Sequence, residues 1–476
     1  MDSPSDQKFS RLTLTAMVVG SMVGAGIFSL PARFGTATGP FGAIIAWLIA
    51  GGGMLMLAFV FQSLAVRKPD LDAGIYAYPR AGFGDYLGFA AAFGFWAGTC
   101  LGNTTYFILI MSTLGKIFPV FGEGNTVAAV LASSVILWSV HFMVLRGIKE
   151  AAFINQVVTI AKIVPIFVFI IIMIFAFKSD LFIGSFWGGG DYGSAEIFNQ
   201  VRSTMLVTVF VFIGIEGASV YSRYAKKRED VGWATVLGFV GVLCLLVLVT
   251  LLPYGVMERT ALGELRQPSM AGVLGTVVGP WGIWFVSIGL IVSVLGAYLA
   301  WSLLAAEVLY SAAKSKLVPN ALGYENQNQV PSTALWITTI LVQVFLIVTL
   351  FAQEAFNLAL DMTSAKTLIP YVLVAAYAVK LTVTRETYGP GSKGRGLDMT
   401  WAILATLYAF FMIVAGGLKF VLLSCIIFAP GTLLFIFAKR EQRLRIFTSA
   451  EWVLFFVILI GAAVGVYGLV TGVISI

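Results

Sequence analysis

Long stretches of mainly apolar residues recur from one end of this 476-residue chain to the other, and they limit the kinds of fold open to it. A helix that crosses a membrane needs about 20 such residues. Hydrophobic residues make up 59% of the sequence and charged residues only 11%, whereas roughly a quarter of the residues in a soluble protein are charged. A soluble fold would leave much of that apolar surface in water. The sequence therefore predicts an all-α polytopic membrane protein.

Thirteen segments are long and apolar enough to be candidate membrane helices. They are 11–34, 40–66, 84–116, 125–145, 151–177, 199–223, 232–256, 281–313, 333–352, 354–379, 400–418, 420–438 and 451–475. The loops between them are short, which predicts one integral membrane domain over residues 1–476 without a soluble appendage.

The distribution of Lys and Arg predicts the orientation. If the polar N-terminal tail lies in the cytoplasm, 21 of the 30 basic residues fall in cytoplasmic segments and seven on the opposite side. This bias agrees with the positive-inside rule. An odd number of spans then places the C-terminus opposite the N-terminus. The apolar stretch that follows this tail lacks a small-residue cleavage site, so we expect an uncleaved first helix.

Several other classes of protein are disfavoured by what the sequence lacks. Its three cysteines (Cys100, Cys244 and Cys425) stand in apolar runs and it has one histidine, His141, so neither a disulfide framework nor a zinc site is expected. There is no G-x-S-x-G nucleophile motif and no TVGYG channel filter. The net charge of +7 is spread through short loops and is explained by topology. We expect no enzyme activity, no cofactor and no nucleic-acid partner.

Glycines interrupt two of the predicted helices. The first helix contains the run GSMVGAGIFSLP (20–31), and the sixth contains FVFIGIEGASVYSR (210–223). Each glycine weakens a helix by ~1 kcal/mol relative to alanine, and unwound backbone is tolerated in a membrane only where it lines a protein cavity. Matching breaks in two halves of a chain indicate a transporter's binding site. The alternative is that these small residues only allow close helix packing.

A pair of such breaks suits the head group of an amino acid. N–H groups at the start of the second half-helix, around Gly24, Ala25, Gly26 and Ile27, would face a carboxylate with the positive end of the helix dipole. Carbonyl groups before Ile213, at the end of the other half-helix, would accept hydrogen bonds from an ammonium group.

Three runs resemble a known family: GSMVGAGIFSLP, DAGIYAYPRAGFGDYLGF (72–89) and FIGIEGASVYSRYAKKREDVG (212–232). They resemble the amino acid–polyamine–organocation superfamily, most closely its basic amino acid/polyamine antiporters and their arginine/ornithine branch. The resemblance extends from about residue 10 to residue 440. It implies a LeuT-like fold of two inverted five-helix repeats (11–177 and 199–379) with broken helices 1 and 6. Two or three extra helices would follow, over 400–475.

The resemblance also implies a function. It indicates a secondary transporter in the bacterial inner membrane, with a periplasmic C-terminus, that exchanges arginine for ornithine by alternating access. Its partners would be cationic amino acids and membrane lipid, and a homodimer is a further expectation. The alternative is a proton-coupled symporter of amino acids or polyamines.

Site residues follow from the resemblance by position. In similar arginine/agmatine exchangers, a GSG break binds carboxylate. Here the run is Gly24-Ala25-Gly26, so the serine hydroxyl is missing and Ser21 would substitute for it. The asparagine that touches the guanidinium matches Asn103, with Thr99 one turn before it.

Three further positions match on later helices. A gating tryptophan of the sixth helix falls at Phe210. The tryptophan that covers the substrate's aliphatic stem matches Trp301, with Tyr298 nearby. A tenth-helix serine falls at Asp361, which would place an acid near the substrate's distal cation.

Ionisable residues within the predicted spans are functional candidates, because each costs ~2.5–3.5 kcal/mol on insertion scales. Glu216 would gate the site or bind the ammonium group, or else cap loose backbone. Glu307 would pair with Lys162 or face the pathway. Lys162 resembles an occupant of the sodium site of sodium-coupled relatives, although a structural salt bridge is the alternative. A pair between Asp361 and Lys366 is also open.

Overall fold

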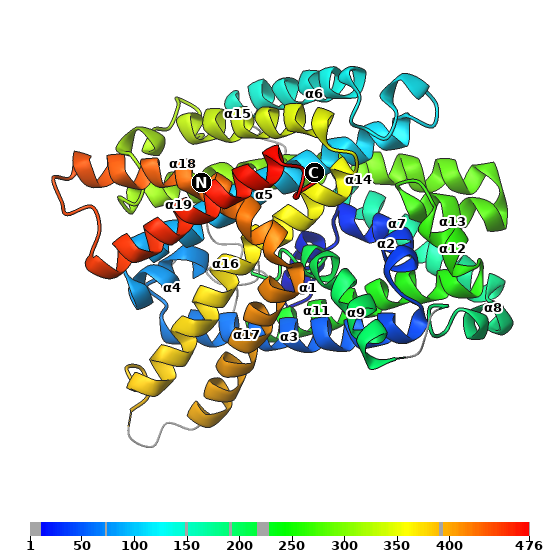
Figure 1. The fold of residues 1–476 in the computed structure, drawn as a ribbon, viewed down its shortest axis with the longest axis horizontal. Helices are drawn as coiled ribbons and strands as arrows, with labels where there is room; N and C mark the ends of the chain where they lie inside the picture. Colours follow the sequence, from blue (N-terminus) through cyan, green and yellow to red (C-terminus); the bar gives the residue numbers. More distant parts are fainter. Residues whose placement is uncertain are drawn as a thin grey trace, which may run out of the picture.

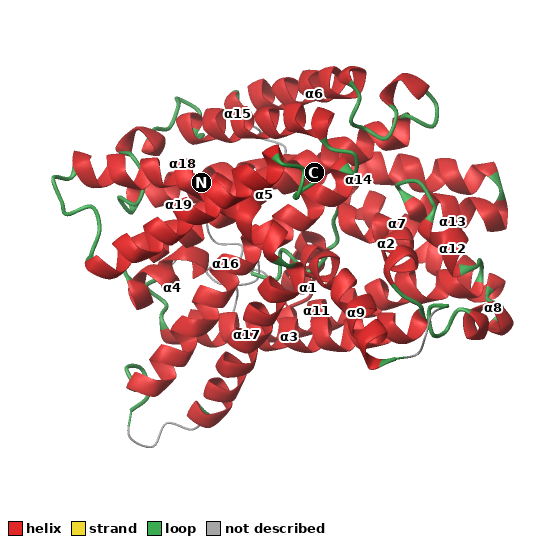
Figure 2. Cartoon of the chain, viewed as in Figure 1, coloured by secondary structure: helices red, strands yellow, loops and turns green. Residues whose placement is uncertain are grey.

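The computed structural model describes residues 11–71, 74–147, 151–189, 193–216, 228–389 and 394–475. Within these ranges every regular element is a helix (Figure 2). The elements up to residue 210 are α1 (Arg11–Met22), η2 (Ala25–Ser29), α2 (Leu30–Ala37), α3 (Pro40–Arg67), α4 (Gly74–Phe83), α5 (Asp85–Leu114), η3 (Pro119–Phe121), α6 (Val127–Leu145), α7 (Ala151–Ala176), α8 (Ser179–Gly184) and α9 (Ser194–Phe210). The label η marks a short 3₁₀ helix.

The second half of the chain is equally helical. Its elements are α11 (Arg228–Leu251), η5 (Leu252–Gly255), α12 (Arg259–Gly263), α13 (Ser269–Val278), α14 (Pro280–Lys314), η6 (Asn320–Gly323), α15 (Ser332–Val348), η7 (Thr349–Phe351), α16 (Ala355–Thr384), α17 (Arg395–Gly416), α18 (Leu418–Glu441) and α19 (Ser449–Val470). Each of the thirteen predicted segments contains helix.

Nine of the described helices are long and apolar enough to span a membrane by length and composition. Four predicted segments are not among the nine. The first and sixth fall short because α1 and α9 end early, and in the fifth the apolar helix that counts is only Ala161–Ala176. Helix α5 is long enough but too polar for this limit, and every residue from Gly88 to Thr113 is buried. Surrounded by protein on all sides, α5 can carry Thr99, Asn103 and other polar residues that a lipid-facing helix could not.

Helix α5 is the central element of the molecule. It packs against α16 and α14, and also against α4 and α15. Figure 1 shows α3, α5, α6, α15 and α19 running roughly along the longest axis of the molecule. Helices α18 and α19 pack against each other at the periphery.

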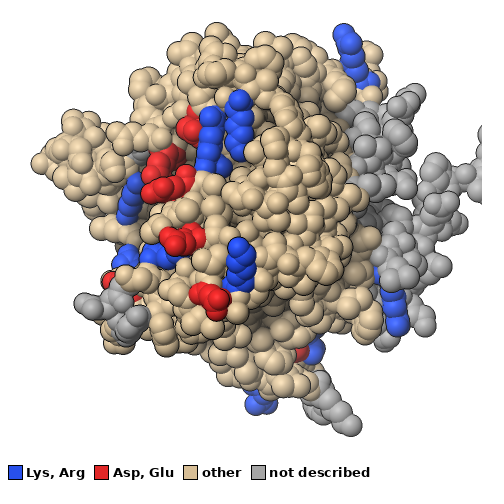
Figure 3. Space-filling model, turned by 90° about the vertical axis from the view of Figure 1, so that its right-hand side faces the viewer, with Lys and Arg blue, Asp and Glu red and all other residues tan. Residues whose placement is uncertain are grey.

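Charged side chains gather at an end of this long axis. Figure 3 looks at the end where α8, α12 and α13 lie in Figure 1, and shows Lys, Arg, Asp and Glu side chains grouped on an otherwise uncharged surface. Such an end suits contact with water, whereas the large apolar side chains exposed along the long helices, such as Leu48, Val135 and Phe410, suit lipid. The long helices therefore run across the membrane.

Candidate functional site

The first break lies between α1 and α2. Helix α1 ends at Met22, and Gly24 is extended, with φ −116° and ψ −156°. The chain then re-enters helical structure through η2, which runs directly into α2. The first N–H groups of such a turn have no partner within the helix. Because 3₁₀ hydrogen bonds join each N–H to the carbonyl three residues earlier, the N–H groups of Ala25 and Gly26 are the ones without a partner within η2, and they are available to a ligand. The N–H group of Ile27, which the sequence also placed at the ligand, pairs within η2.

The second break follows α9, which ends at Phe210, and residues 211–216 form turns. Gly214 has φ +112°, and a side-chain carbon there would lie 2.6 Å from the carbonyl oxygen of Ser21. The Ser21 hydroxyl donates to the Gly214 carbonyl at 3.0 Å. The two breaks thus face each other in contact, which confirms the predicted arrangement. Gly217 lies outside the described residues.

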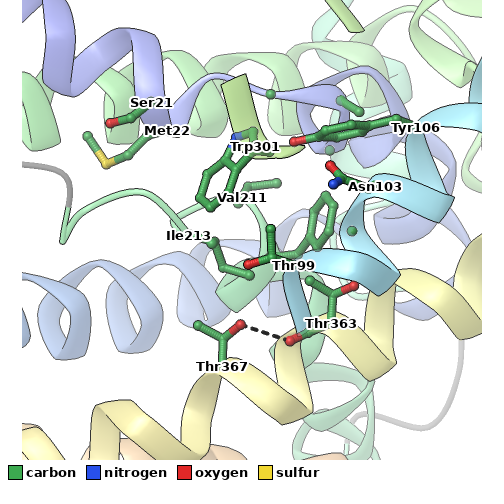
Figure 4. Close-up of a pocket in the computed structure, with 15 residues that line it drawn as sticks. Ser21, Met22, Thr99, Asn103, Tyr106, Val211, Ile213, Trp301, Thr363 and Thr367 are labelled. Atoms are coloured by element: carbon green, nitrogen blue, oxygen red, sulfur yellow. Dashed lines mark hydrogen bonds between the residues drawn. The ribbon is translucent and has the colours of Figure 1, made fainter. Parts of the chain in front are cut away.

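A pocket with about 450 Å³ of empty space lies beside the two breaks (Figure 4). Helices α5, α14 and α16 complete its wall. Nine of its lining residues are ones that the sequence singles out: Ser21, Gly24, Ala25, Gly26, Thr99, Asn103, Phe210, Ile213 and Trp301. Six others were not predicted: Met22, Gly102, Tyr106, Val211, Thr363 and Thr367.

Helical spacing was the signal that could have found most of the missed residues. Residues three or four positions apart share one face of a helix. Gly102 and Tyr106 lie three residues after Thr99 and Asn103, and Thr363 and Thr367 are four residues apart on α16. Once Asn103 is placed in the pocket, Tyr106 follows from geometry alone.

Asn103 presents an acceptor to the pocket. Its side-chain nitrogen lies 3.4 Å from the Ser302 hydroxyl, to which it donates. Its Oδ1 atom is buried and has no hydrogen-bond partner among the described residues. Because a buried acceptor without a partner costs free energy, a cationic donor bound here would satisfy it.

Four predicted site residues do not line the pocket. Ile27 is buried within η2, and the Tyr298 ring packs against Phe107 with 4.6 Å between ring centroids. Glu216 accepts hydrogen bonds from the Gly214 N–H at 3.1 Å and from the Tyr371 hydroxyl at 2.6 Å. This carboxylate therefore ties the second break to α16, in keeping with the expected alternative that it caps loose backbone.

Asp361 is the fourth, and it has a protein partner. Its Oδ1 atom lies 2.6 Å from Nη2 of Arg33, and the two side chains are 14% and 16% exposed. Asp361 stands two residues before Thr363, which turns it to another side of α16 from the pocket wall. The pair considered between Asp361 and Lys366 does not form, because the Lys366 ammonium donates instead to the Ser424 carbonyl at 2.9 Å.

Lys162 reaches the first break from α7. Its ammonium group donates a hydrogen bond to the carbonyl oxygen of Gly20, in the last turns of α1. Glu307 is exposed on α14 and accepts a hydrogen bond from Ser311 on the same helix at 3.4 Å. His141 is bonded to Thr339, on the α6–α15 pair away from the pocket.

Comparison with known proteins places the chain in a family. The sequence pattern of the amino acid permease family matches residues 9–419. The chain is 52% identical to the arginine/ornithine antiporter of Pseudomonas aeruginosa, over 99% of both chains. It is 40% identical to the L-lysine transport protein of Corynebacterium glutamicum, over 98% of this chain and 95% of that protein.

The fold also matches a solved structure. The crystal structure of MhsT in complex with L-phenylalanine superposes with a TM-score of 0.61 over 86% of this chain and 99% of that chain, at 13% sequence identity. The LeuT-like fold and the family expected from the three motifs are both confirmed. This chain is a multi-pass membrane transporter rather than an enzyme, and it belongs to the amino acid permease family.

Proposed function

We propose that this protein exchanges cationic amino acids across the bacterial inner membrane, arginine for ornithine, by alternating access. The observation that carries the proposal is a pocket between two helix breaks with amide donors on one side and the acceptor of Asn103 on another. It occurs in a chain that is 52% identical, along its whole length, to an arginine/ornithine antiporter.

The substrate's head group would bind at the breaks. Its carboxylate would accept hydrogen bonds from the N–H groups of Ala25 and Gly26, which also lie at the positive end of the α2 dipole. Its ammonium group would donate to carbonyls in the turn after Phe210, around Ile213. Both charges of the zwitterion are then met by backbone groups, which no side-chain substitution removes.

The side chain of the substrate would extend toward α5 and α14. Trp301 and Phe210 offer aromatic faces for the aliphatic stem, and the distal cation would reach Asn103 Oδ1 and the hydroxyl oxygen of Thr99. None of the described residues that line the pocket is an acid. Guanidinium and ammonium groups would therefore be recognised by neutral dipoles and aromatic rings.

Lys162 would hold the first break as a tethered cation, because its ammonium already binds a carbonyl of the unwinding helix. A fixed cation at this place removes the need for a sodium ion. Exchange would then run without sodium, driven by the gradients of the two amino acids. Glu307 stays a candidate gating residue on α14.

The remaining assignments complete the proposal. Residues 11–177 and 199–379 would form the two inverted repeats, with 400–475 as additional helices. The N-terminus would be cytoplasmic and the C-terminus periplasmic. The apolar side chains exposed along the long helices would contact lipid or a second copy in a homodimer.

Counterflow in proteoliposomes tests the exchange. Vesicles loaded with ornithine should accumulate labelled arginine, and empty vesicles should not, because the empty carrier returns poorly. Replacing sodium with potassium should leave the rate unchanged. A symporter would behave in the opposite way, with a proton gradient driving arginine into empty vesicles, and that result would replace the proposed function with the alternative.

A further inference from the structure

Tyr106, on the central helix α5, lines the pocket beside the first break. Its side chain is 6% exposed, and Figure 4 shows its hydroxyl end inside the pocket, on the same side as Asn103 and Trp301. A side-chain carbon built on Gly24 would lie 3.6 Å from the Tyr106 oxygen. The phenol therefore reaches the extended residue that precedes the free N–H groups of η2.

The other hydroxyl groups of the pocket already give their protons to the main chain. Each donates to a carbonyl oxygen at 2.7 to 3.0 Å, and they belong to Ser21, Thr99, Thr363 and Thr367. A hydroxyl group carries a single proton, so these four offer a ligand only their lone pairs. Tyr106 makes no hydrogen bond to any residue that the structure describes. Among the described residues that line the pocket, Tyr106 is therefore the one whose hydroxyl proton is still open to a ligand.

Ser21 therefore does not offer its hydroxyl proton to the substrate's carboxylate, contrary to what the family resemblance implied. The resemblance implied that Ser21 would substitute for the serine hydroxyl that the run Gly24-Ala25-Gly26 lacks. Its proton is instead held between the carbonyls of Val18 and Gly214, at 2.8 and 3.0 Å. The missing donor must come from another element, and α5 supplies one.

We propose that Tyr106 donates its phenolic proton to the α-carboxylate of the bound amino acid, and so makes the site select amino acids over the corresponding decarboxylated amines. This assignment rests on the proposed function, because it adds one donor to the same site. The carboxylate accepts from the N–H groups of η2 on one side and from the phenol of α5 on the other. Hydrogen bonds to charged groups are strong enough that losing one weakens binding about 10- to 100-fold.

A cycle that changes both protein and ligand tests the assignment. The purified full-length protein and its Tyr106→Phe variant are titrated calorimetrically with arginine and ornithine, and with agmatine and putrescine, which lack the carboxylate. For the variant, the Kd of both amino acids should rise about 10- to 100-fold. The Kd of both amines should change far less.

Tyr408→Phe is the matched control. It removes another buried phenol hydroxyl without a partner, from α17 outside the pocket. Any effect of this variant should be the same for arginine and agmatine. Equal losses for arginine and agmatine in Tyr106→Phe, or no loss for arginine, would overturn the role of Tyr106. A wild-type protein that binds no cationic amino acid would instead overturn the proposed function itself.

Discussion

Single residues shape the pocket as much through missing side chains as through the groups that line it. A side-chain carbon at Gly26 would lie 2.7 Å from atoms of both Phe210 and Val211. The two broken helices can approach this closely only because glycine stands there. At Gly20, four residues before the break, the same added carbon would meet nothing within 4 Å. Close contact therefore requires glycine at position 26, whereas position 20 has room for a larger side chain.

Gly26→Ala should therefore damage the site. The methyl group must push Phe210 into the pocket or separate the two breaks, and overpacking costs typically 1–3 kcal/mol. Arginine affinity should fall about tenfold or more, as measured by equilibrium binding to purified protein. Gly20→Ala should bind arginine like the wild type. Equal affinities for all three proteins would show that the contact between the breaks does not define the site.

The sequence revealed those site residues whose signal is local. The glycine runs marked both breaks, and the family motifs pointed to Asn103 and Trp301. Tyr106 was missed although helical spacing from Asn103 could have found it. Helical spacing could not predict the salt-bridge partner of Asp361, because Arg33 lies 328 positions away in the sequence. Only the packing of α2 against its neighbours brings the two together.

At the scale of elements, a salt bridge links the half-helix α2 to α16. Arg33 and Asp361 are both mostly buried, and their charged atoms lie 2.6 Å apart. Removing one partner of a buried pair is costly because the other charge is left uncompensated. The bridge connects α16, which lines the pocket, to α2, which continues the chain after the first break. The salt bridge favours a role for Asp361 in holding these helices together, whereas the family resemblance implied a direct contact with the substrate's cation.

Asp361→Asn distinguishes these two roles. If Asp361 acts through Arg33, the variant should bind arginine and its neutral analogue citrulline less well by the same factor. The charge-reversed double variant Arg33→Asp/Asp361→Arg should recover part of the loss. Competition binding with both ligands measures this. A loss confined to arginine would restore Asp361 as the acceptor of the distal cation.

At the scale of the whole molecule, the hydropathy pattern predicted helix in each of the thirteen segments. It could not predict which helix is central. Helix α5 is buried along its length, which allows it to carry polar residues. These residues lower its hydropathy, and two of them, Thr99 and Asn103, line the pocket. Helix α19 is the opposite case, with only 11% of its apolar window buried and its packing mainly against α18. A helix so exposed needs lipid around it.

If α19 crosses the membrane, the residues before it and after it lie on opposite sides. In a variant with Cys100, Cys244 and Cys425 replaced, a new cysteine at Val473 should react with a membrane-impermeant maleimide applied to the periplasmic side. A cysteine at Leu444, before α19, should react only after the membrane is permeabilised. Both positions are exposed, at 81% and 54%. The same accessibility for both would mean that α19 does not cross.

An experimental structure with bound L-arginine would show whether a cationic amino acid binds between the two helix breaks. The arginine carboxylate should lie within hydrogen-bond distance of the N–H groups of Ala25 and Gly26, and the guanidinium group should lie beside Asn103 Oδ1. The aliphatic stem should lie on Trp301. Arginine bound elsewhere, or bound with its guanidinium on Asp361 and its carboxylate away from η2, would contradict the account.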